Sequence, residues 1–354
     1  MTGSVPDPSD LESRRRTTSR TAALQGAGQP ALDALAAARV LVVGAGGLGA
    51  PVLTYLAGSG LGRVTVVDHD VVDTSNLARQ TLFAAADVGR PKAECAAERV
   101  RAVDPVVEVV ALAERFRPEH VDGHDVVVDA ADSVEVTRAV SDACAAAGVP
   151  FVWGTALGYD GQVSVFHDAA PEPVDFHDLH PEPLPDEGSC AADGVLPALC
   201  GAVGAVMAAQ VGALVAGLGE PLTGRVLTVD AWRWRWTESP LRRGPGSVRP
   251  AAPAGEPPRV APAELARWLG DDGRPVVLVD VRTEEELATG VIPGSRAPGQ
   301  ATDDVELVVV CASGGRATAW ARRAIADRPD DAPPVTVLDG GITAWRREGL
   351  PTTA

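Results

Sequence analysis

One ten-residue stretch, VLVVGAGGLG, constrains the fold more than any other part of the chain. Its β-branched residues predict a buried strand that ends at Gly44, and Gly46 and Gly49 complete the spacing G-x-G-x-x-G. Glycines at this spacing allow a tight turn into a helix and let backbone N–H groups at the helix N-terminus approach a phosphate. The helical segment APVLTYLAGSG and the apolar run RVTVVD follow directly, so the stretch opens a βαβ unit.

The next apolar segments continue this alternation of strand and helix. Predicted strands are VEVVAL, DVVVDA, PFVWGTA and GQVSVF, with the helix SVEVTRAVSDACAAAG between the second and the third. Apolar strands joined by helical crossovers are typical of a parallel sheet covered on both faces. We therefore predict a doubly wound, Rossmann-like α/β domain with a mostly parallel sheet. We interpret RVLTVDAWRWRW as one closing strand, whose alternating Trp and Arg residues give an apolar and a charged face and not a base-stacking surface.

The segment from Val195 to Gly219 lacks charged residues and is long enough to span a bilayer. Alanine and glycine dominate it, however, and Gln210 lies near its middle. The flanking residues Asp193 and Glu220 are acidic, so no excess of Lys or Arg sets an orientation in a membrane. We therefore predict a buried, closely packed helix and no membrane association.

The charge and the cysteine content limit the kinds of partner and the cellular compartment that we expect for this protein. The 48 acidic and 31 basic residues give a net charge of −17, which repels nucleic-acid phosphates, so we expect no nucleic-acid partner. Five scattered cysteines are typical of a reducing compartment and not of a disulfide framework. The first twenty or so residues are polar and contain no apolar signal segment, so we expect a cytoplasmic protein.

Changes in composition divide the 354 residues into four parts. We predict an N-terminal arm (1–37), a first α/β domain (38–240), a Pro/Gly linker (241–258) and a second, smaller α/β domain (259–354). Within the first domain, residues 167–189 are rich in proline and acid and predict a long crossover loop. In the second domain, PVVLVDVRTEEELATG and ELVVVCASGGRATAWARRAIA again alternate strand and helix.

Charged residues after the glycine-rich turn distinguish between nucleotides. Asp68 ends the next strand and could accept hydrogen bonds from a ribose, which would suit NAD as well as ATP. Arg79 and Lys92 follow, and two such cations suit a triphosphate, whereas a dinucleotide needs neither. Asp129 and Asp132 lie at the carboxyl end of a later strand, where one or two carboxylates could hold a Mg²⁺ that bridges phosphates.

Together, the glycine-rich strand and turn, DTSNLARQ, VGRPKAE and DAADS resemble the ThiF/MoeB family of ubiquitin-activating-enzyme-like adenylyltransferases over about residues 15–240. The resemblance implies that ATP is the nucleotide and that the substrate is the C-terminal glycine carboxylate of a small ubiquitin-fold sulfur-carrier protein. Arg79 and Lys92 are the implied catalytic cations, and Asp132 is the implied Mg²⁺ ligand. The implied nucleotide-binding residues are Gly44, Gly46, Gly47, Gly49, Asp68, Ser75, Asn76, Arg79, Lys92, Asp132 and Ser133.

The N-terminal arm departs from this family's pattern. Family members insert an arginine from an arm with text similar to RYSR into the site of a partner protomer, which implies a homodimer. The best match here is TTSR, which gives Arg20, although the tyrosine and the first arginine of the pattern are missing. Arg16 is the alternative, and a further interpretation of the run RRR is a solvated basic tail.

Two cysteine features of the family differ here. Many members hold a structural zinc with two C-x-x-C pairs, one before the crossover loop and one near the domain end. HDAAPEPVDFHDLH and SPLRRGPGS occupy those places in this chain, so we predict no structural zinc. Cys190, in SCAADGVL, matches a family cysteine at the end of the crossover loop and is predicted to be a reachable thiol, whereas Cys95, Cys144 and Cys200 are predicted core residues.

In the second domain, CASGGR lies between a predicted buried strand and a helix. Backbone amides, the helix dipole and Arg316 would stabilise a thiolate or persulfide on Cys311. Four residues separate Cys311 from Arg316, fewer than the five of phosphatases with similar architecture, and the smaller loop suits a sulfane sulfur. LVDVRTEEELATGVIPGS, CASGGRATAW and LDGGITAWRREGLP resemble a single rhodanese domain over residues 259–354.

The two resemblances combine into one predicted reaction, that of fused adenylyltransferase/sulfurtransferases of the MoeZ type. Adenylation of the carrier glycine would be followed by attack of a Cys311 persulfide, charged by a separate sulfur donor such as a cysteine desulfurase. Cys190 would release a thiocarboxylate for molybdopterin, thiamin or cysteine synthesis. The alternatives are a ubiquitin-like activator that forms a thioester on Cys190 without sulfur transfer, an NAD-dependent oxidoreductase, and a non-catalytic scaffold that binds the carrier.

Overall fold

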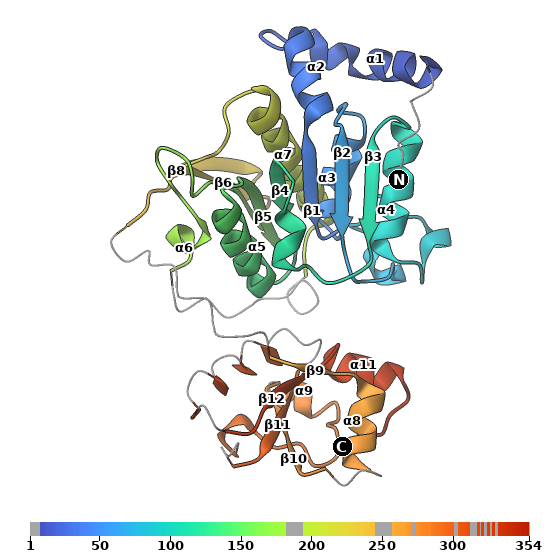
Figure 1. Ribbon diagram of the computed structural model, residues 1–354, viewed down its shortest axis with the longest axis vertical. Coiled ribbons are helices and arrows are strands. Elements are labelled where there is room, and N and C mark those ends of the chain that lie inside the picture. The colour runs from blue at the N-terminus through green and yellow to red at the C-terminus, as the bar shows by residue number, and fades with distance from the viewer. Residues whose placement is uncertain are drawn as a thin grey trace. The chain divides into compact units, whose positions relative to one another are not determined.

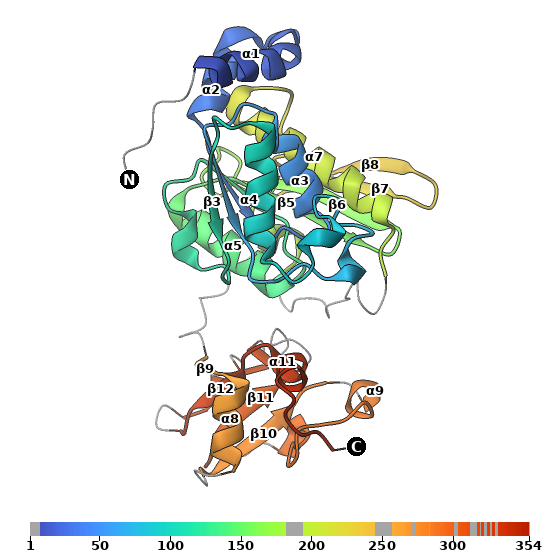
Figure 2. The same cartoon turned by 90° about the vertical axis from the view of Figure 1, so that its right-hand side faces the viewer.

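The chain divides into two compact units, residues 1–249 and 250–354. The computed structural model (Figures 1 and 2) describes residues 8–181, 194–244, 257–270, 274–282, 284–300, 304–311 and 332–353, together with the pairs 317–318, 320–321, 324–325 and 328–329. Each unit contains one sheet with helices packed on it, and each is described by itself below.

An eight-stranded sheet in the order β3-β2-β1-β4-β5-β6-β7-β8 organises the first unit. Its first five strands are parallel and in register, as continuous apolar runs predict. They are β1 (Arg39–Val43), β2 (Arg63–Val67), β3 (Glu108–Leu112), β4 (Val126–Asp129) and β5 (Phe151–Leu157). The strand order reverses direction at β1, next to β4, and in doubly wound sheets such a switch point marks the ligand crevice.

The remaining strands extend the sheet as an antiparallel meander and correct one expectation. β6 (Asp160–Phe166), β7 (Arg225–Asp230) and β8 (Arg235–Pro240) pair antiparallel, and β6 also pairs antiparallel with β5. The segment RVLTVDAWRWRW is therefore not one strand, because the chain turns at residues 231–234 and returns as β8. Trp232 and Trp234 lie in this turn, and Trp234 has a positive φ of 51°. The tryptophans are exposed, and the prediction that they form one apolar face of a strand is wrong.

Helices cover both faces of this sheet, as predicted. α3 (Gly49–Ala57), α4 (Lys92–Val103) and α7 (Pro197–Ala216) pack on one face, whereas α5 (Val134–Ala147) and α6 (Phe176–Leu179) pack on the other (Figure 2). Successive residues of β1 alternate between the two cores: Val40 and Val42 face α3, and Leu41 and Val43 face α5. The sheet therefore buries apolar side chains on both faces, which explains its nearly continuous apolar strands.

The apolar segment around Gln210 forms helix α7, which contacts α3, β5 and β6. By length and composition alone α7 could cross a membrane, and half of its most apolar window is buried in the unit. Leu199, Val203, Met207 and Val211 line the core, and the Gln210 side chain accepts a hydrogen bond from the backbone N–H of Leu222. The helix thus packs as a core element of the first unit, as predicted.

An ionic cluster, here called the Arg243 clamp, joins the end of this unit to the segment after β6. The Arg243 guanidinium lies 2.5 Å from Asp168, 3.1 Å from Asp175 and 3.3 Å from Asp178. The Asp178 and Asp175 side chains are 0% and 7% exposed, so the ion pairs with this arginine offset the cost of burying the two carboxylates. The two segments it joins are those in which zinc-binding members of the resembled family carry their cysteine pairs.

We expect Arg243→Ala to destabilise the first unit by about 2 kcal/mol, because it leaves buried carboxylates without a cation. Arg242→Ala is the matched control, since Arg242 is exposed and adjacent. Urea unfolding of both variants and of the wild type measures the difference. Equal unfolding midpoints for the two variants would show that the clamp contributes nothing.

The second unit has a four-stranded parallel sheet in the order β10-β11-β12-β9. Its strands are β9 (Arg259–Val260), β10 (Val276–Asp280), β11 (Glu306–Val310) and β12 (Val335–Leu338). α8 (Pro262–Leu269) and α11 (Gly341–Arg347) pack on one face with Leu265, Ile342 and Trp345, and the short α9 (Glu284–Leu287) follows β10. At the carboxyl end of β10, a buried ion pair joins Arg282 to Asp280 at 2.8 Å. This is the smaller α/β domain that the sequence predicts.

Candidate active site

The glycine-rich turn lies at the carboxyl end of β1, where close packing against backbone atoms requires glycine at two positions. Gly44 has a φ of +89°, and a Cβ there would lie 2.7 Å from the carbonyl oxygen of Ala130. A Cβ on Gly49 would overlap the carbonyl oxygen of Gly44, and a Cβ on Gly47 would approach the Cys200 sulfur to 3.3 Å. By contrast, a Cβ on Gly46 would meet nothing closer than a flexible side chain at 3.8 Å. The turn is therefore tight at Gly44 and Gly49 and open at Gly46.

This difference predicts unequal effects of alanine within the turn. We expect Gly49→Ala to destabilise the unit by about 3 kcal/mol or more and to abolish ATP binding, because the added methyl must displace backbone. Gly46→Ala is the matched control and is expected to change stability by less than about 1 kcal/mol. Thermal unfolding and calorimetric titration with ATP test both variants. The structural account of the turn is wrong if Gly49→Ala unfolds like the wild type.

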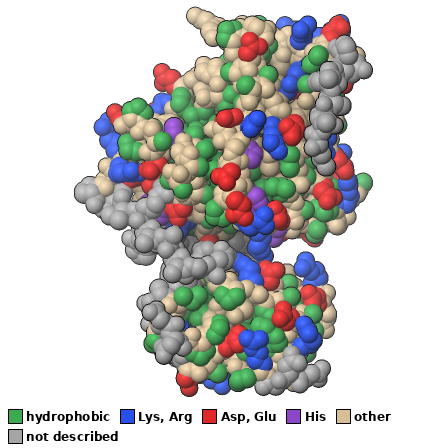
Figure 3. Space-filling view, in the orientation of Figure 1, with side chains coloured by type: hydrophobic (Ala, Val, Ile, Leu, Met, Phe, Trp, Pro, Cys, Tyr) green, Lys and Arg blue, Asp and Glu red, His purple; other side chains and the backbone are tan. Residues whose placement is uncertain are grey.

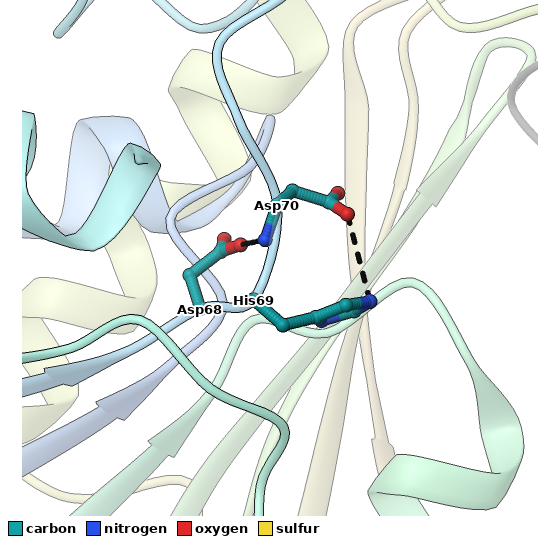
Figure 4. Close-up of side chains that lie close together, drawn as sticks. All are labelled: Asp68, His69 and Asp70. Atoms are coloured by element: carbon teal, nitrogen blue, oxygen red, sulfur yellow. Dashed lines mark hydrogen bonds and ion pairs between the residues drawn. The ribbon is translucent and has the colours of Figure 1, made fainter. Parts of the chain in front are cut away.

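A chain of hydrogen bonds joins this turn to Lys92. Asp68, directly after β2, accepts bonds from the backbone N–H groups of Ala45 at 2.7 Å and Asp70 at 2.8 Å. Asp70 pairs with the Lys92 ammonium at 3.0 Å, and its other carboxylate oxygen lies 3.5 Å from His69 (Figure 4). Burial raises the pKa of Asp68, although Lys92 opposes this. Burial also acts to raise the pKa of Asp70, but Lys92 and other cations more than offset it and lower that pKa.

The predicted phosphate-binding segment lies against the glycine turn. Ser75 and Asn76 belong to a short 3-10 helix, η1 (Thr74–Asn76), which Asp73 caps by accepting a hydrogen bond from the Ser75 N–H at 2.8 Å. The Arg79 guanidinium donates to the Ser75 carbonyl at 3.2 Å. The Arg79 Cδ lies 3.6 Å from the position of a Cβ on Gly47. Residues predicted from separate motifs therefore meet at one edge of the sheet.

The segment after β4 completes the same edge. The Asp129 side chain is fully buried, and its Oδ1 atom accepts a hydrogen bond from the Ala131 N–H at 3.1 Å. Its Oδ2 atom has no hydrogen-bond partner among the described residues. Asp132 is exposed, and Ser133 caps α5. Because Ala130 contacts the Gly44 turn, Asp132 and Ser133 lie beside the predicted phosphate site.

Burial raises the pKa of Asp129 to about 6, so this carboxyl disfavours folding once it ionises. Since the pKa is raised relative to the unfolded chain, its stabilising contribution is present below about pH 4 and is lost as the pH rises through about 6. We therefore expect Asp129→Asn to be more stable than the wild type at pH 7.5, by up to about 3 kcal/mol. The gap should close near pH 4.

Urea unfolding at several pH values measures this gap. Asp132→Asn is the control, because Asp132 is exposed and its loss should leave stability nearly unchanged. A gap between Asp129→Asn and the wild type that does not vary with pH contradicts the expectation.

The N-terminal arm lies at the opposite edge of the sheet. It forms α1 (Pro8–Ala22) and α2 (Gly28–Ala37), which Figure 1 shows at the amino ends of the strands. Arg14 anchors α1 by pairing with Asp104 at 2.8 Å and by donating to the Leu61 carbonyl. Arg20 and Arg16 are exposed on α1, and Arg16 pairs with Glu12. Neither arginine therefore joins the candidate site of its own chain.

Cys311 directly follows β11 in the second unit and is 1% exposed. Its carbonyl accepts a hydrogen bond from Ile342 at 2.9 Å, which ties the strand end to α11. The neighbouring strand β10 ends at the buried Asp280–Arg282 pair, so this end of the sheet is held firmly. Arg316 and Cys190 both lie outside the described residues. Cys95, Cys144 and Cys200 are buried, as predicted.

The comparison with protein families agrees with this geometry. The ThiF family profile matches residues 18–247, which cover the whole candidate nucleotide site. The chain belongs to the ThiF family. A rhodanese-like domain profile matches residues 261–348, which include Cys311. The chain thus combines a ThiF domain with a C-terminal rhodanese-like domain, and both resemblances predicted from its motifs are confirmed.

Relatives with both domains exist. The chain is 36% identical over 349 residues to a protein named as a probable adenylyltransferase/sulfurtransferase, MoeZ of Mycobacterium tuberculosis, covering 89% of this chain and 88% of the relative. The present chain is also similar to the sulfur carrier protein adenylyltransferase of Thermus thermophilus, with 41% identity over 60% of this chain and 82% of that relative. The fold resembles E. coli MccB solved with ATP, with a TM-score of 0.54, 20% identity, and coverage of 61% of this chain and 67% of MccB.

The sequence motifs did not reveal the role of Asp70 in this ThiF domain. Asp70 follows Asp68 by two residues but lies 22 residues before Lys92, so no local pattern links it to the lysine. One signal was available: Lys92 is the only lysine in the chain, and a buried ammonium requires an anion nearby.

Proposed function

We propose that this chain adenylates the C-terminal glycine of a ubiquitin-fold sulfur-carrier protein with ATP and then converts the glycine to a thiocarboxylate with sulfur from Cys311. The observation that carries this proposal is the presence of both sites in one chain. The ThiF domain brings the glycine turn, Arg79 and Lys92 together, and the rhodanese-like domain supplies Cys311 at a strand end. The match to 88% of MoeZ supports the same pairing.

In the first step, a carboxylate oxygen of the carrier attacks the α-phosphorus of ATP and pyrophosphate leaves, which gives an acyl-adenylate. Backbone N–H groups of the glycine turn, Arg79 and Lys92 stabilise the negative charge that develops on the phosphates. Asp68 positions the turn through Ala45 and is placed to accept hydrogen bonds from the ribose.

The residues after β4 fit a magnesium ion. Asp132 offers an exposed carboxylate beside the turn, and Mg²⁺ needs only one or two protein carboxylates when phosphates supply other oxygens. When bound, the ion would neutralise phosphate charge and orient the leaving group.

In the second step, a persulfide on Cys311 attacks the acyl carbon, and AMP leaves as the new C–S bond forms. The product is an acyl disulfide between the carrier and Cys311. A second thiol, for which Cys190 is our candidate, attacks the Cys311 sulfur of this disulfide, so that the carrier thiocarboxylate leaves and the two cysteines form a disulfide. A cellular reductant then regenerates the thiols, and a separate donor such as a cysteine desulfurase reloads Cys311.

The setting of the reaction is also part of the proposal. Persulfide chemistry requires reduced thiols, so the proposal includes a reducing, cytoplasmic setting. Arg20 would complete the nucleotide site of a second chain, in a homodimer. Because a ubiquitin-like activator that stops at a thioester needs no rhodanese-like domain, the presence of this domain favours sulfur transfer.

Mass spectrometry of candidate carriers tests the proposal. Carriers ending in glycine are incubated with the enzyme, ATP, Mg²⁺ and a persulfide donor. We expect the carrier to gain sulfur in place of one terminal oxygen and to remain unchanged without ATP. Sulfur incorporation that does not require ATP, or none with any carrier, contradicts the proposed function.

A further inference from the structure

Lys92 is the only lysine of this chain, and the other 30 of its 31 basic residues are arginines. Basic side chains are spread over the face shown in Figure 3, and every Lys or Arg of the chain apart from Lys92 is an arginine. Lysine and arginine are not equivalent, because a deprotonated lysine side chain is a nucleophile, whereas the guanidinium of arginine stays charged. The one lysine therefore introduces the one side-chain amine of the protein directly into the candidate site.

This amine is held at two points by Asp70. The ammonium lies 3.0 Å from the Asp70 carboxylate, and the backbone N–H of Lys92 donates to the Asp70 carbonyl at 2.9 Å. The Lys92 side chain is only 7% exposed, whereas that of Asp70 is 54% exposed. Asp70 is itself fixed, because its N–H donates to Asp68, as Figure 4 shows. A largely exposed carboxylate is thus paired with an almost fully buried ammonium.

The proposed function gives this arrangement a chemical purpose. An acyl-adenylate reacts readily with amines: the nitrogen bonds to the acyl carbon, the bond to AMP breaks, AMP leaves, and one proton passes to solvent. Such a step would attach the carrier permanently to the enzyme through an amide. An ammonium that shares its proton with a carboxylate has no lone pair available for this attack.

We propose that Asp70 is a positioning residue: whenever no triphosphate occupies the site, it holds the ammonium of Lys92 in an ion pair and so prevents the amine from attacking the activated carrier as a nucleophile. The protective role of Asp70 rests on the proposed function, but its pairing with the Lys92 ammonium can be tested without a carrier. Asp70 yields the ammonium to the more highly charged triphosphate and recovers it once pyrophosphate has left, which is when the acyl-adenylate is present.

The first test measures the reactivity of Lys92 towards trinitrobenzenesulfonate, by peptide mapping of the full-length protein. Because the chain has one lysine, the labelled side chain is unambiguous. We expect Asp70→Asn to react about tenfold faster than the wild type, and Asp70→Glu to restore slow labelling. Glu94→Gln, which removes an exposed charge from the same helix turn, is the matched control and should react like the wild type. Equal rates for Asp70→Asn and the wild type overturn the proposal, since burial alone would then protect the amine.

The second test measures ATP binding by calorimetry, with excess EDTA and with Mg²⁺. We expect Asp70→Asn to bind ATP about five- to tenfold more tightly in both conditions, because a competing carboxylate is removed. Weaker binding in EDTA overturns the proposal, because Asp70 would then help to hold the nucleotide. Weaker binding with Mg²⁺ alone overturns it in favour of a metal ligand.

A third measurement connects the inference to turnover. With a carrier and ATP, Asp70→Asn should accumulate a carrier–enzyme amide at Lys92 that the wild type lacks, and its turnover should fall although it binds ATP more tightly. If the wild type adenylates no carrier, the proposed function fails while the labelling and binding tests still decide the role of Asp70. A variant that labels rapidly yet forms no amide during turnover overturns the protective role.

Discussion

Cys311→Ser is expected to abolish thiocarboxylate formation, by at least about a thousandfold, while carrier adenylation continues at the wild-type rate. The expectation follows from the chemistry of the replaced atom, since a serine hydroxyl cannot carry a sulfane sulfur. Serine is close to cysteine in size, but it adds a hydroxyl to the apolar cluster with Val279 and Val337 around the strand end, so some loss of stability in the second unit is expected. Carrier mass spectrometry measures the product, and ATP–pyrophosphate exchange measures adenylation.

Cys95→Ser is the matched control for this variant. Cys95 is also buried, but it lies on α4, and we assign it no role in the reaction. Its replacement should leave sulfur transfer intact. Thiocarboxylate formation by Cys311→Ser at a rate close to that of the wild type would falsify the assignment of Cys311 as the sulfur carrier.

Lys92→Met should produce the reciprocal result, a loss of adenylation of about a hundred- to a thousandfold. Methionine preserves much of the apolar volume of the lysine, but it offers no charge to the phosphates. Lys92→Arg should also be impaired, because a planar guanidinium is larger than the ammonium held by Asp70 in a 7% exposed position. ATP–pyrophosphate exchange in the presence of the carrier measures the loss.

The second unit provides the control for Lys92. Sulfur loading of Cys311 by a persulfide donor should be normal in Lys92→Met, because that reaction requires no nucleotide. A Lys92→Met enzyme with full exchange activity would show that the pairing with Asp70 is purely structural. Loss of sulfur loading in the same variant would instead indicate that the substitution disturbs the whole chain.

Local patterns predicted the architecture well, because strands and crossover helices leave periodic signals. The apolar run before Gly44 predicted β1 and its turn, and the apolar helix around Gln210 was predicted as a core element. The β7–β8 hairpin was missed, since its turn at residues 231–234 contains neither glycine nor proline. There the backbone N–H of Arg233 donates to the Asp230 side chain, which stabilises a turn that has no turn signal in the sequence.

Charge pairs between distant residues account for most of what the sequence could not reveal. Arg243 lies 65 to 75 residues beyond the three carboxylates it joins. Asp70 meets Lys92 only because β2 and α4 bring their ends together. Such contacts depend on the finished fold and leave no periodicity in the chain. The motifs therefore predicted which groups meet the nucleotide but not which groups hold them in place.

Helix α1 lies at the edge of the sheet farthest from the nucleotide turn of its own chain. If Arg20 serves a second chain, each complete catalytic centre draws on two polypeptides. Two inactive proteins, one lacking Arg20 and the other lacking Lys92, would then share one working centre after their subunits are exchanged. If Arg20 acts in this way, two defective copies of the gene would complement each other, because α1 lies far from the nucleotide turn of its own chain.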